Sequence, residues 1–344
     1  MKALVLNDPG GPSPLSVVEA PSPVPGLGEA LVQVKACGAC HHDLLAARGV
    51  LRRGVKPGVV LGHEFSGTVC EVGAGVTAVS PGDRVVAILT GACGRCDRCV
   101  NGLEHRCRDG RGIGHSHDGG FAEYVAVPEF SLVSLDDDAD LGAAALYACP
   151  MGVALQGLQQ AGRVQAGETV VVTGAGGGLG VHAVQLAAAL GARVLAVTSS
   201  PDKAPQLAGL GAAEVIETGE LDFSEIVLAL TEDEGAQVVL DTVGSALFPS
   251  SWRSLAQYGR LVMLGEVAGG RLDLNPAEIV FKDARIVGSA GVSKAAVRQV
   301  AGMVSQGLVR PVVAESMALE QVGAALETIA NRGVLGRILL EPRL

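Results

Sequence analysis

Four cysteines stand at short, regular intervals in the first third of the chain, at Cys93, Cys96, Cys99 and Cys107. Four thiolates from one short stretch can surround a zinc ion tetrahedrally, and a site saturated in this way is structural rather than catalytic. The alternative interpretation is a cluster of disulfides, which are uncommon in cytosolic proteins. The spacing therefore predicts a structural zinc site in a glycine-containing loop.

A second set of candidate metal ligands is dispersed over the first 150 residues. Two cysteines and one histidine would give zinc three protein ligands and leave a fourth position open, which is the arrangement of a catalytic zinc site. Taken singly, each of these residues is more commonly structural, because free cysteine is among the most buried residue types. The candidates are Cys40, His63 and Cys149, with His41, His42, Asp43 and Glu64 beside them.

The two remaining cysteines, Cys37 and Cys70, lie in strand-like segments. Cys37 forms a C-x2-C pair with Cys40, but Cys40 already has a metal role. We therefore expect both Cys37 and Cys70 to be core residues.

A glycine-rich turn follows the strand-like residues 169–173 and leads into an apolar helix expected over 181–190. In this context the turn lets backbone N–H groups and the helix N-terminus approach a pyrophosphate. A tight structural turn without a ligand is the alternative interpretation. The residues expected to contact the nucleotide are Gly174, Gly176, Gly177, Gly178, Leu179 and Gly180.

The end of the next strand indicates which nicotinamide nucleotide binds. An enzyme that uses NAD usually places a carboxylate there to bind the ribose 2′-hydroxyl. Here the strand runs into Thr198, Ser199 and Ser200, with Lys203 just beyond. Hydroxyl groups and a lysine suit a 2′-phosphate better, so the sequence favours NADP(H). The alternative is that these residues only cap the helix that begins near Pro201.

The elements that must position these residues fall into two groups, and 344 residues exceed one comfortable core. Residues 1–150 contain short alternating strands at 30–36, 68–72 and 84–89, which predicts a β-rich domain. Over 151–289 six apolar strand-like segments alternate with helices, which predicts a doubly wound parallel sheet and an α/β fold. We assign residues 290–344 to the first domain.

Composition indicates a globular protein with ample apolar mass. Hydrophobic residues make up 48% of the chain, and the formal net charge is −10. A negative charge without a basic tail argues against nucleic acid or an anionic membrane as the partner. The first residues do not read as a signal peptide or an anchor, so we expect a cytoplasmic protein without a membrane partner.

Together these features resemble the zinc-dependent medium-chain dehydrogenase/reductase family of alcohol-dehydrogenase-like enzymes, and the resemblance runs from end to end. Beyond the four cysteines, it rests on residues 40–43, 61–64, 71–73, 81–85, 119–124 and 173–180. It implies a GroES-like catalytic domain, a Rossmann domain, and a homodimer or homotetramer.

The resemblance also implies roles for single residues. Cys40, His63 and Cys149 would bind a catalytic zinc, so that each subunit would hold two zinc ions. Glu64 would lie close enough to be an exchanging ligand, and Asp43 would hydrogen-bond the far nitrogen of His63 and fix its tautomer. His41 would face the nucleotide pyrophosphate, for which an ordinary surface histidine is the alternative.

Two departures from the family pattern bear on the substrate. Members active on alcohols usually carry Ser or Thr two residues after the first zinc cysteine, where this chain has His42. The glycine loop is also longer than in many alcohol dehydrogenases and resembles that of quinone, enoyl and acryloyl-CoA-type reductases.

The leading hypothesis is a zinc-dependent, NADP(H)-linked alcohol/carbonyl oxidoreductase in which His42 relays the proton. The alternative is an enoyl-CoA (acryloyl-CoA-type) or quinone reductase of the same superfamily. A third hypothesis is a non-catalytic nucleotide-binding or redox-sensing protein.

Overall fold

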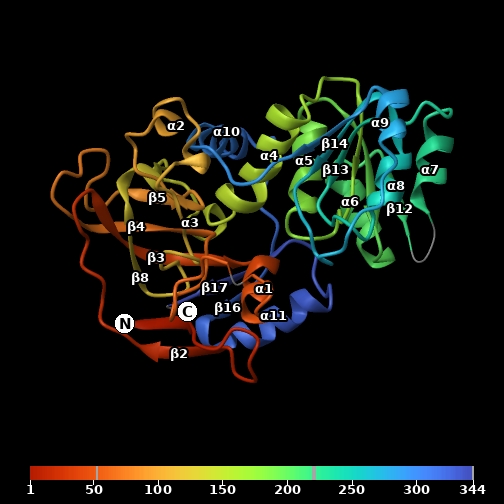
Figure 1. The fold of residues 1–344 in the computed structure, drawn as a ribbon. Coiled ribbons are helices and arrows are strands. Elements are labelled where there is room, and N and C mark those ends of the chain that lie inside the picture. The colour runs from red at the N-terminus through yellow and green to blue at the C-terminus, as the bar shows by residue number, and fades with distance from the viewer. Residues whose placement is uncertain (52, 219–221, 343–344) are drawn as a thin grey trace. The chain divides into compact units, whose positions relative to one another are not determined.

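The computed structural model describes residues 1–51, 53–218 and 222–342. Contacts within the chain divide it into two compact units (Figure 1). Unit 1 comprises Met1–Gly152, Gly291–Ser305 and Pro311–Leu344, and unit 2 comprises Val153–Ala290 and Gln306–Arg310.

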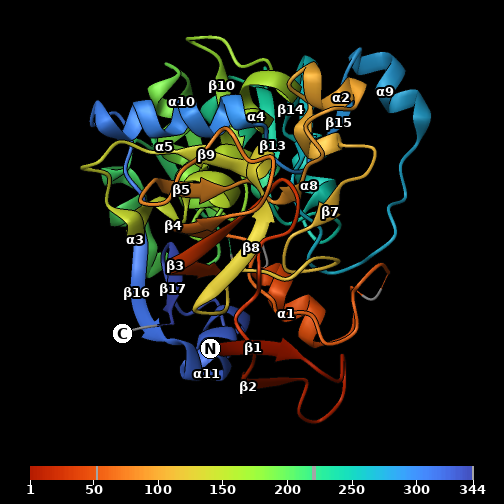
Figure 2. The same ribbon diagram turned by 90° about the vertical axis from the view of Figure 1, so that its left-hand side faces the viewer.

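A mixed sheet of seven strands forms the centre of unit 1. The strand order is β16-β17-β3-β4-β5-β9, and β8 also pairs with β3. Figure 2 shows these strands side by side, from β9 and β5 at one end to β17 and β16 at the other. The strands are β3 (Glu29–Ala39), β4 (Phe65–Val72), β5 (Arg84–Ala87), β8 (Tyr124–Pro128), β9 (Leu132–Ser134), β16 (Val313–Ala318) and β17 (Arg337–Glu341).

Smaller elements of unit 1 surround this sheet. Strands β1 (Lys2–Leu6) and β2 (Leu15–Glu19) pair with each other, as do β6 (Thr90–Gly91) and β7 (Arg111–Gly112). The helices are α1 (His41–Ala47), α2 (Asp97–Val100), η1 (Glu104–Arg106), η2 (Glu129–Ser131), α3 (Leu141–Ala144), η3 (Tyr147–Gly152), α10 (Lys294–Ser305), η6 (Leu319–Gln321) and α11 (Val322–Ala330).

The two cysteines expected in the core have different surroundings. Cys37 is fully buried in β3, as predicted. The prediction for Cys70 is wrong, because its side chain is exposed in β4 while that of the preceding Val69 is buried. Successive side chains of a strand point to opposite faces, so the side chain that follows a buried one faces outwards.

Unit 2 is built on six parallel strands in the order β12-β11-β10-β13-β14-β15. This confirms the predicted doubly wound parallel sheet. The central strand β10 is apolar and buried throughout, as expected of a sheet covered on both faces. The strands are β10 (Thr169–Val172), β11 (Arg193–Thr198), β12 (Glu214–Glu217), β13 (Ala236–Asp241), β14 (Leu255–Met263) and β15 (Arg285–Gly288).

Helices cover the two faces of this sheet (Figure 1). Helix α5 contacts β10 and β11, whereas α8 contacts β13 and β14. The helices of unit 2 are α4 (Val153–Gln156), η4 (Gly157–Ala161), α5 (Gly180–Ala189), η5 (Pro201–Lys203), α6 (Ala204–Gly209), α7 (Phe223–Leu230), α8 (Phe248–Arg253) and α9 (Pro276–Lys282).

The strand order reverses between β10 and β13. Strands that follow β10 first build outwards through β11 and β12, and the chain then returns to the other side of β10. In open parallel sheets, ligands bind beyond the carboxyl ends of the strands at this point of reversal. The glycine-rich turn starts here, directly after β10 and Thr173.

A buried carboxylate holds the two central strand ends together. One oxygen of Asp241, Oδ1, accepts hydrogen bonds from the hydroxyl of Thr173 at 2.9 Å and from the backbone N–H groups of Val243 and Gly244 at 2.8 and 2.9 Å. The other oxygen, Oδ2, accepts one from Ser251 at 2.9 Å. Because Thr173 precedes the glycine-rich turn, this network fixes where that turn leaves the sheet.

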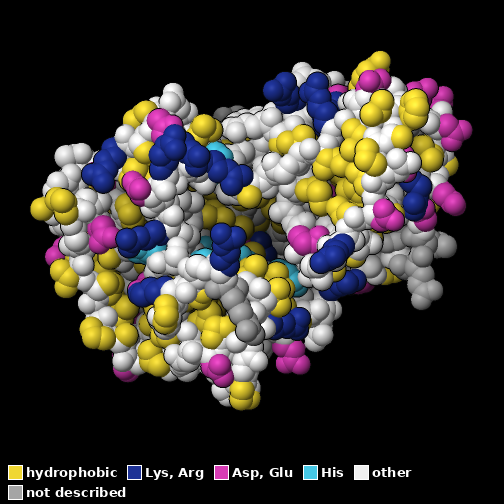
Figure 3. Space-filling model, in the orientation of Figure 1, with side chains coloured by type: hydrophobic (Ala, Val, Ile, Leu, Met, Phe, Trp, Pro, Cys, Tyr) yellow, Lys and Arg dark blue, Asp and Glu magenta, His cyan; other side chains and the backbone are white. Residues whose placement is uncertain are grey.

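Hydrophobic side chains gather on the face of unit 2 around α8 and α9 (Figure 3). Helix α9 has no buried residue, and its Val280 and Phe281 are 69% and 80% exposed. Exposed apolar side chains beside an edge strand such as β15 are typical of surfaces that contact another protein. The homodimer or homotetramer remains a prediction, which a measurement of molar mass in solution would test.

Among the described residues, no helix combines the length and the apolar composition needed to cross a membrane.

Replacing Asp241 by Asn should destabilise unit 2. The amide nitrogen cannot accept the hydrogen bond that Ser251 donates, and the neutral amide oxygen is a weaker acceptor than the carboxylate for the three other donors, where a hydrogen bond to a charged group contributes about 1.5–3 kcal/mol. We expect urea denaturation to show a loss of about 2 kcal/mol in the free energy of unfolding. Asp202→Asn, at an exposed position, is the control. Equal unfolding free energies for the two variants would contradict the importance of the network.

Candidate metal centres and nucleotide-binding loop

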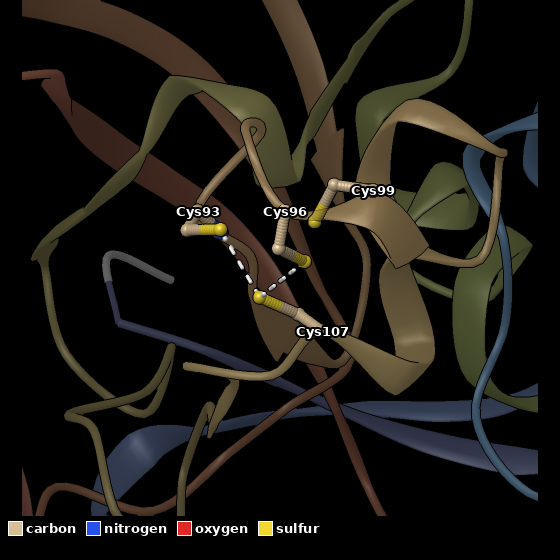
Figure 4. Close-up of side chains that lie close together, drawn as sticks. All are labelled: Cys93, Cys96, Cys99 and Cys107. Atoms are coloured by element: carbon tan, nitrogen blue, oxygen red, sulfur yellow. Dashed lines mark hydrogen bonds between the residues drawn. The ribbon is translucent and has the colours of Figure 1, made fainter.

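The four cysteines of the first predicted metal site converge in one loop of unit 1 (Figure 4). Their sulfur atoms all lie within 4.8 Å of one another, and those of Cys96 and Cys107 are 3.9 Å apart. A tetrahedral zinc ion with Zn–S bonds of about 2.3 Å would hold its sulfurs about 3.8 Å apart. All eight cysteines of the chain are free thiols, so the geometry fits zinc rather than disulfides.

Short helices and an ion pair shape this loop. Cys96 precedes α2, and Arg108 donates two hydrogen bonds to Asp97, of 2.5 and 2.8 Å, which tie the first turn of α2 to the chain just after Cys107. Backbone N–H groups of Arg108 and Cys99 lower the pKa of Cys96 to about 6. The thiolate that zinc requires is therefore favoured at this cysteine.

The second predicted site also assembles within unit 1. The ligand atoms of Cys40, His63, Glu64 and Cys149 lie within 4.8 Å of one another. Cys40 lies between β3 and α1, His63 and Glu64 directly precede β4, and Cys149 lies in η3, a π-helix that contains Pro150. Two thiols, an imidazole and a carboxylate are ligands that zinc accepts.

The backbone beside this cluster has room only for glycine at two positions. At Gly62, where φ is +91°, a Cβ would lie 2.7 Å from the ring of Phe121 and 2.8 Å from the sulfur of Cys37. At Gly38 a Cβ would lie 2.2 Å from Glu64 Oε2. These glycines let His63 and Glu64 lie directly against β3.

His63 lies between two carboxylates. Its Nδ1 is 3.6 Å from Asp43 Oδ1, and its Nε2 is 3.6 Å from Glu64 Oε1. Burial lowers the pKa of His63, but Asp43 and Cys40 outweigh burial and raise it well above its ordinary value. Asp43 thus lies next to His63, as expected, but the distance between their atoms is too long for a hydrogen bond. Asp43 Oδ2 instead accepts the backbone N–H of Cys40 at 2.9 Å.

Arg337 is a site residue that the sequence interpretation missed. Its Nε lies 3.0 Å from Glu64 Oε2, and both side chains are buried, although the pair lacks hydrogen-bond geometry. Burial raises the pKa of Glu64 to about 8 despite the opposing charge of Arg337. The available signal was a lone arginine at the start of the last strand, directly before three apolar residues.

The histidines near the cluster form a second, smaller group. The ring of His42 lies 5.0 Å from that of His63 and 5.6 Å from that of His115, measured between centroids. The Nδ1 atoms of His42 and His115 are buried and have no hydrogen-bond partner in the part of the chain that the structure describes. His115 was not predicted as a site residue. His41 is half-buried at the start of α1, and its contact with a nucleotide stays a prediction.

In unit 2 the glycine-rich turn is tightly folded. Gly174 has a φ of +60°, and Gly177 donates its backbone N–H to the carbonyl of Gly174 at 2.9 Å. A Cβ at Gly180 would lie 2.2 Å from the same carbonyl. The imidazole of His182 in α5 lies 2.6 Å from the carbonyl of Gly178. This turn at the start of a ten-residue helix fits a pyrophosphate bound by backbone N–H groups.

The residues proposed to choose the nucleotide lie beside this turn. Thr198 is buried at the end of β11 and accepts the backbone N–H of Ser200 at 3.2 Å, while Ser199 is exposed. Lys203 is 5% exposed, and its Nζ lies 3.6 Å from where a Cβ of Gly176 would be. The structure therefore brings Lys203 to the glycine-rich turn.

Two family models match most of the chain. The alcohol dehydrogenase GroES-like domain matches residues 26–137, and the zinc-binding dehydrogenase domain matches residues 178–306. Two proteins named acryloyl-coenzyme A reductase are similar to this chain. The one from Sulfurisphaera tokodaii is 34% identical over 99% of this chain and all of its own length, and the one from Metallosphaera sedula is 37% identical over 99% of both. An alcohol dehydrogenase from Geobacillus stearothermophilus is 32% identical, again over 99% of both chains.

Solved structures agree with this result. The crystal structure of AibC is 37% identical, with a TM-score of 0.92 over 100% of this chain and 96% of its own. A zinc-binding dehydrogenase from Sinorhizobium meliloti 1021, bound to NADP, is 31% identical, with a TM-score of 0.85 over 99% of both chains.

We expect two zinc ions per chain in protein purified without chelator. Cys96→Ser should remove the ion of the four-cysteine loop, and Cys40→Ser should remove the other ion and abolish turnover, because each loses one ligand of its cluster. Elemental analysis of the metal content checks both, with Cys70→Ser at an exposed cysteine as the control. A Cys40→Ser protein that keeps two zinc ions and full activity would contradict the second site.

The geometry and the comparisons point in one direction. Two clusters with zinc-ligand chemistry occupy unit 1, a nucleotide-type glycine turn opens α5 in unit 2, and the matches extend over nearly the whole chain. The chain is an oxidoreductase that belongs to the zinc-binding, medium-chain dehydrogenase/reductase family of alcohol-dehydrogenase-like enzymes.

Proposed function

We propose that this enzyme uses NADPH to reduce the carbon–carbon double bond of a short 2-enoyl-CoA thioester. The observation that carries the proposal is His42, which lies beside the Cys40–His63–Cys149 cluster where members active on alcohols usually carry a hydroxyl. The two relatives named acryloyl-coenzyme A reductase support the same choice, since their identities of 34% and 37% exceed the 32% of the alcohol dehydrogenase.

This reduction adds a hydride to the β-carbon and a proton to the α-carbon, and negative charge develops on the thioester oxygen between the two additions. When bound, the nicotinamide supplies the hydride, and zinc supplies Lewis acidity towards that oxygen. Cys40, His63 and Cys149 would hold the metal with three ligands and leave one position open. Arg337 pairs with Glu64. Because of this pairing, the carboxylate of Glu64 would not occupy the open position of the metal.

His42 would hold the proton. Its Nδ1 has no hydrogen-bond partner among the described residues, so it can donate to a bound substrate without breaking an existing bond. Burial, and after it the nearby His63, lower the pKa of His42, so that its imidazole gives up a proton more readily than an ordinary histidine, whereas a serine or threonine hydroxyl there would only pass a proton along.

The alternative function is oxidation of an alcohol or reduction of a carbonyl group. It is favoured by the complete set of Cys40, His63 and Cys149, because polarising an alcohol or carbonyl oxygen is what an open zinc position does best. A zinc ion at this site is therefore compatible with both reactions, and only assays with the two classes of substrate distinguish them.

NADPH oxidation should be faster with acryloyl-CoA and crotonyl-CoA than with aldehydes and ketones of equal chain length. His42→Ala should lower kcat for the enoyl thioesters by about 100-fold, the usual contribution of one positioned acid. Steady-state assays measure both, with saturated propionyl-CoA as the control that cannot be reduced at a double bond. Faster turnover of aldehydes or ketones in the unmodified enzyme would overturn the proposal in favour of the alternative.

The preference for NADPH rests on Lys203, for which we propose a contact with the ribose 2′-phosphate. Lys203→Met should weaken NADPH binding by about 10–100-fold, because a charge-assisted hydrogen bond contributes about 1.5–3 kcal/mol. NADH lacks the phosphate, so its dissociation constant should change by no more than about twofold in the same fluorescence titration. Equal losses for both nucleotides would mean that Lys203 only supports the glycine-rich turn.

A further inference from the structure

The chain re-enters unit 1 at Gly291. Residues 291–294 lie between the four-cysteine loop and η3, the helix that carries Cys149. Gly291 has a φ of +75°, and a Cβ there would lie 3.0 Å from the Cβ of His105 in the loop. On the other side, a Cβ at Gly152, the last residue of η3, would lie 2.6 Å from Val292. This short segment therefore touches both metal-site regions.

Lys294, the first residue of α10, holds the segment against the loop. It is 8% exposed, and its Nζ lies 4.7 Å from the centre of the Phe130 ring. Phe130 itself packs against the buried cluster of Ala92, Cys99 and Cys107, which includes two of the four cysteines. Burial and Arg298 lower the pKa of Lys294, and the carboxylates of Glu104 and Glu129 oppose this shift. A buried cation held by an aromatic face fixes the position of the helix end that bears it.

Helix α10 in turn packs against η3. The six residues of η3 form a π-helix that contains Pro150, and a proline inside a helix removes one backbone hydrogen-bond donor. The position of Cys149 within η3 therefore depends on what packs against this helix. Val292, which contacts Gly152, is buried.

We propose that the four-cysteine loop positions Cys149 for the other metal cluster through Phe130, Lys294 and the start of α10. Phe130 and Lys294 are positioning residues that act through Cys149. The four-cysteine site then contributes to the geometry of the second site as well as to folding. This inference concerns metal binding, so it holds whichever substrate the enzyme reduces.

The test replaces the metal at the Cys40–His63–Cys149 site of the holoenzyme with Co²⁺, whose visible absorption reports ligand geometry. Lys294→Met and Phe130→Leu should shift this band and speed transfer of Co²⁺ to a chelator by about tenfold, as expected when a supporting contact of a metal site is lost. Lys294→Arg keeps a cation over the ring and should restore both the band and the rate.

The matched control is Lys282→Met, which removes a lysine 5.9 Å from the ring of Trp252 in unit 2. It should leave the band and the release rate within about twofold of the unmodified enzyme. If Lys294→Met does not fold, Cys96→Ser provides the same test, because loss of metal from the loop should also shift the band. An unchanged band and rate in Phe130→Leu or Cys96→Ser, or equal acceleration in Lys282→Met, would overturn the proposal.

Discussion

Anionic side chains can be packed together away from water only when positive charge lies among them, and this constraint governs unit 1. Cys40, Cys149, Glu64 and Asp43 surround His63, and Arg337 is the buried cation beside them. Burial raises the pKa of Glu64 to about 8, so one guanidinium does not neutralise the cluster by itself. A divalent metal ion would supply the missing charge, and this is the physical reason why the cluster fits zinc.

Unit 2 is expected to present backbone N–H groups to a phosphate at a fixed place. The parallel sheet makes this possible because the strand order reverses beside β10, so that the turn after β10 has no neighbouring crossover above it. The carboxylate of Asp241 then fixes Thr173, and the close approach of Gly180 to Gly174 keeps the turn compact. The position and shape of this turn thus depend on sheet topology together with a few glycines.

Membership of the family implies hydride chemistry, and we expect single residues near the Cys40–His63–Cys149 cluster to decide what receives the hydride. His42 and His115 place two ring nitrogens near the cluster that have no hydrogen-bond partner among the described residues. A hydroxyl there would permit less direct proton donation. A metal site with three protein ligands is compatible with either reaction. Specificity in this chain is therefore expected to depend on the histidines around the metal rather than on the metal ligands themselves.

The resemblance to the family supplied Cys40, His63 and Cys149 as the second set of candidate ligands, whereas the sequence by itself determined the four-cysteine set, the glycine-rich turn and the α/β class. Those features depend on residue type and on short spacings, such as the C-x2-C-x2-C-x7-C run and the apolar strands between helices. Only the tertiary structure decided that Arg337 pairs with Glu64, that His115 faces His42, and that Cys70 is exposed while Cys37 is buried. It also showed that Cys149 lies in a π-helix supported by α10. The physical reason is that these relations join residues far apart in the chain, and the pairing and packing that bring them together leave no local pattern in the sequence.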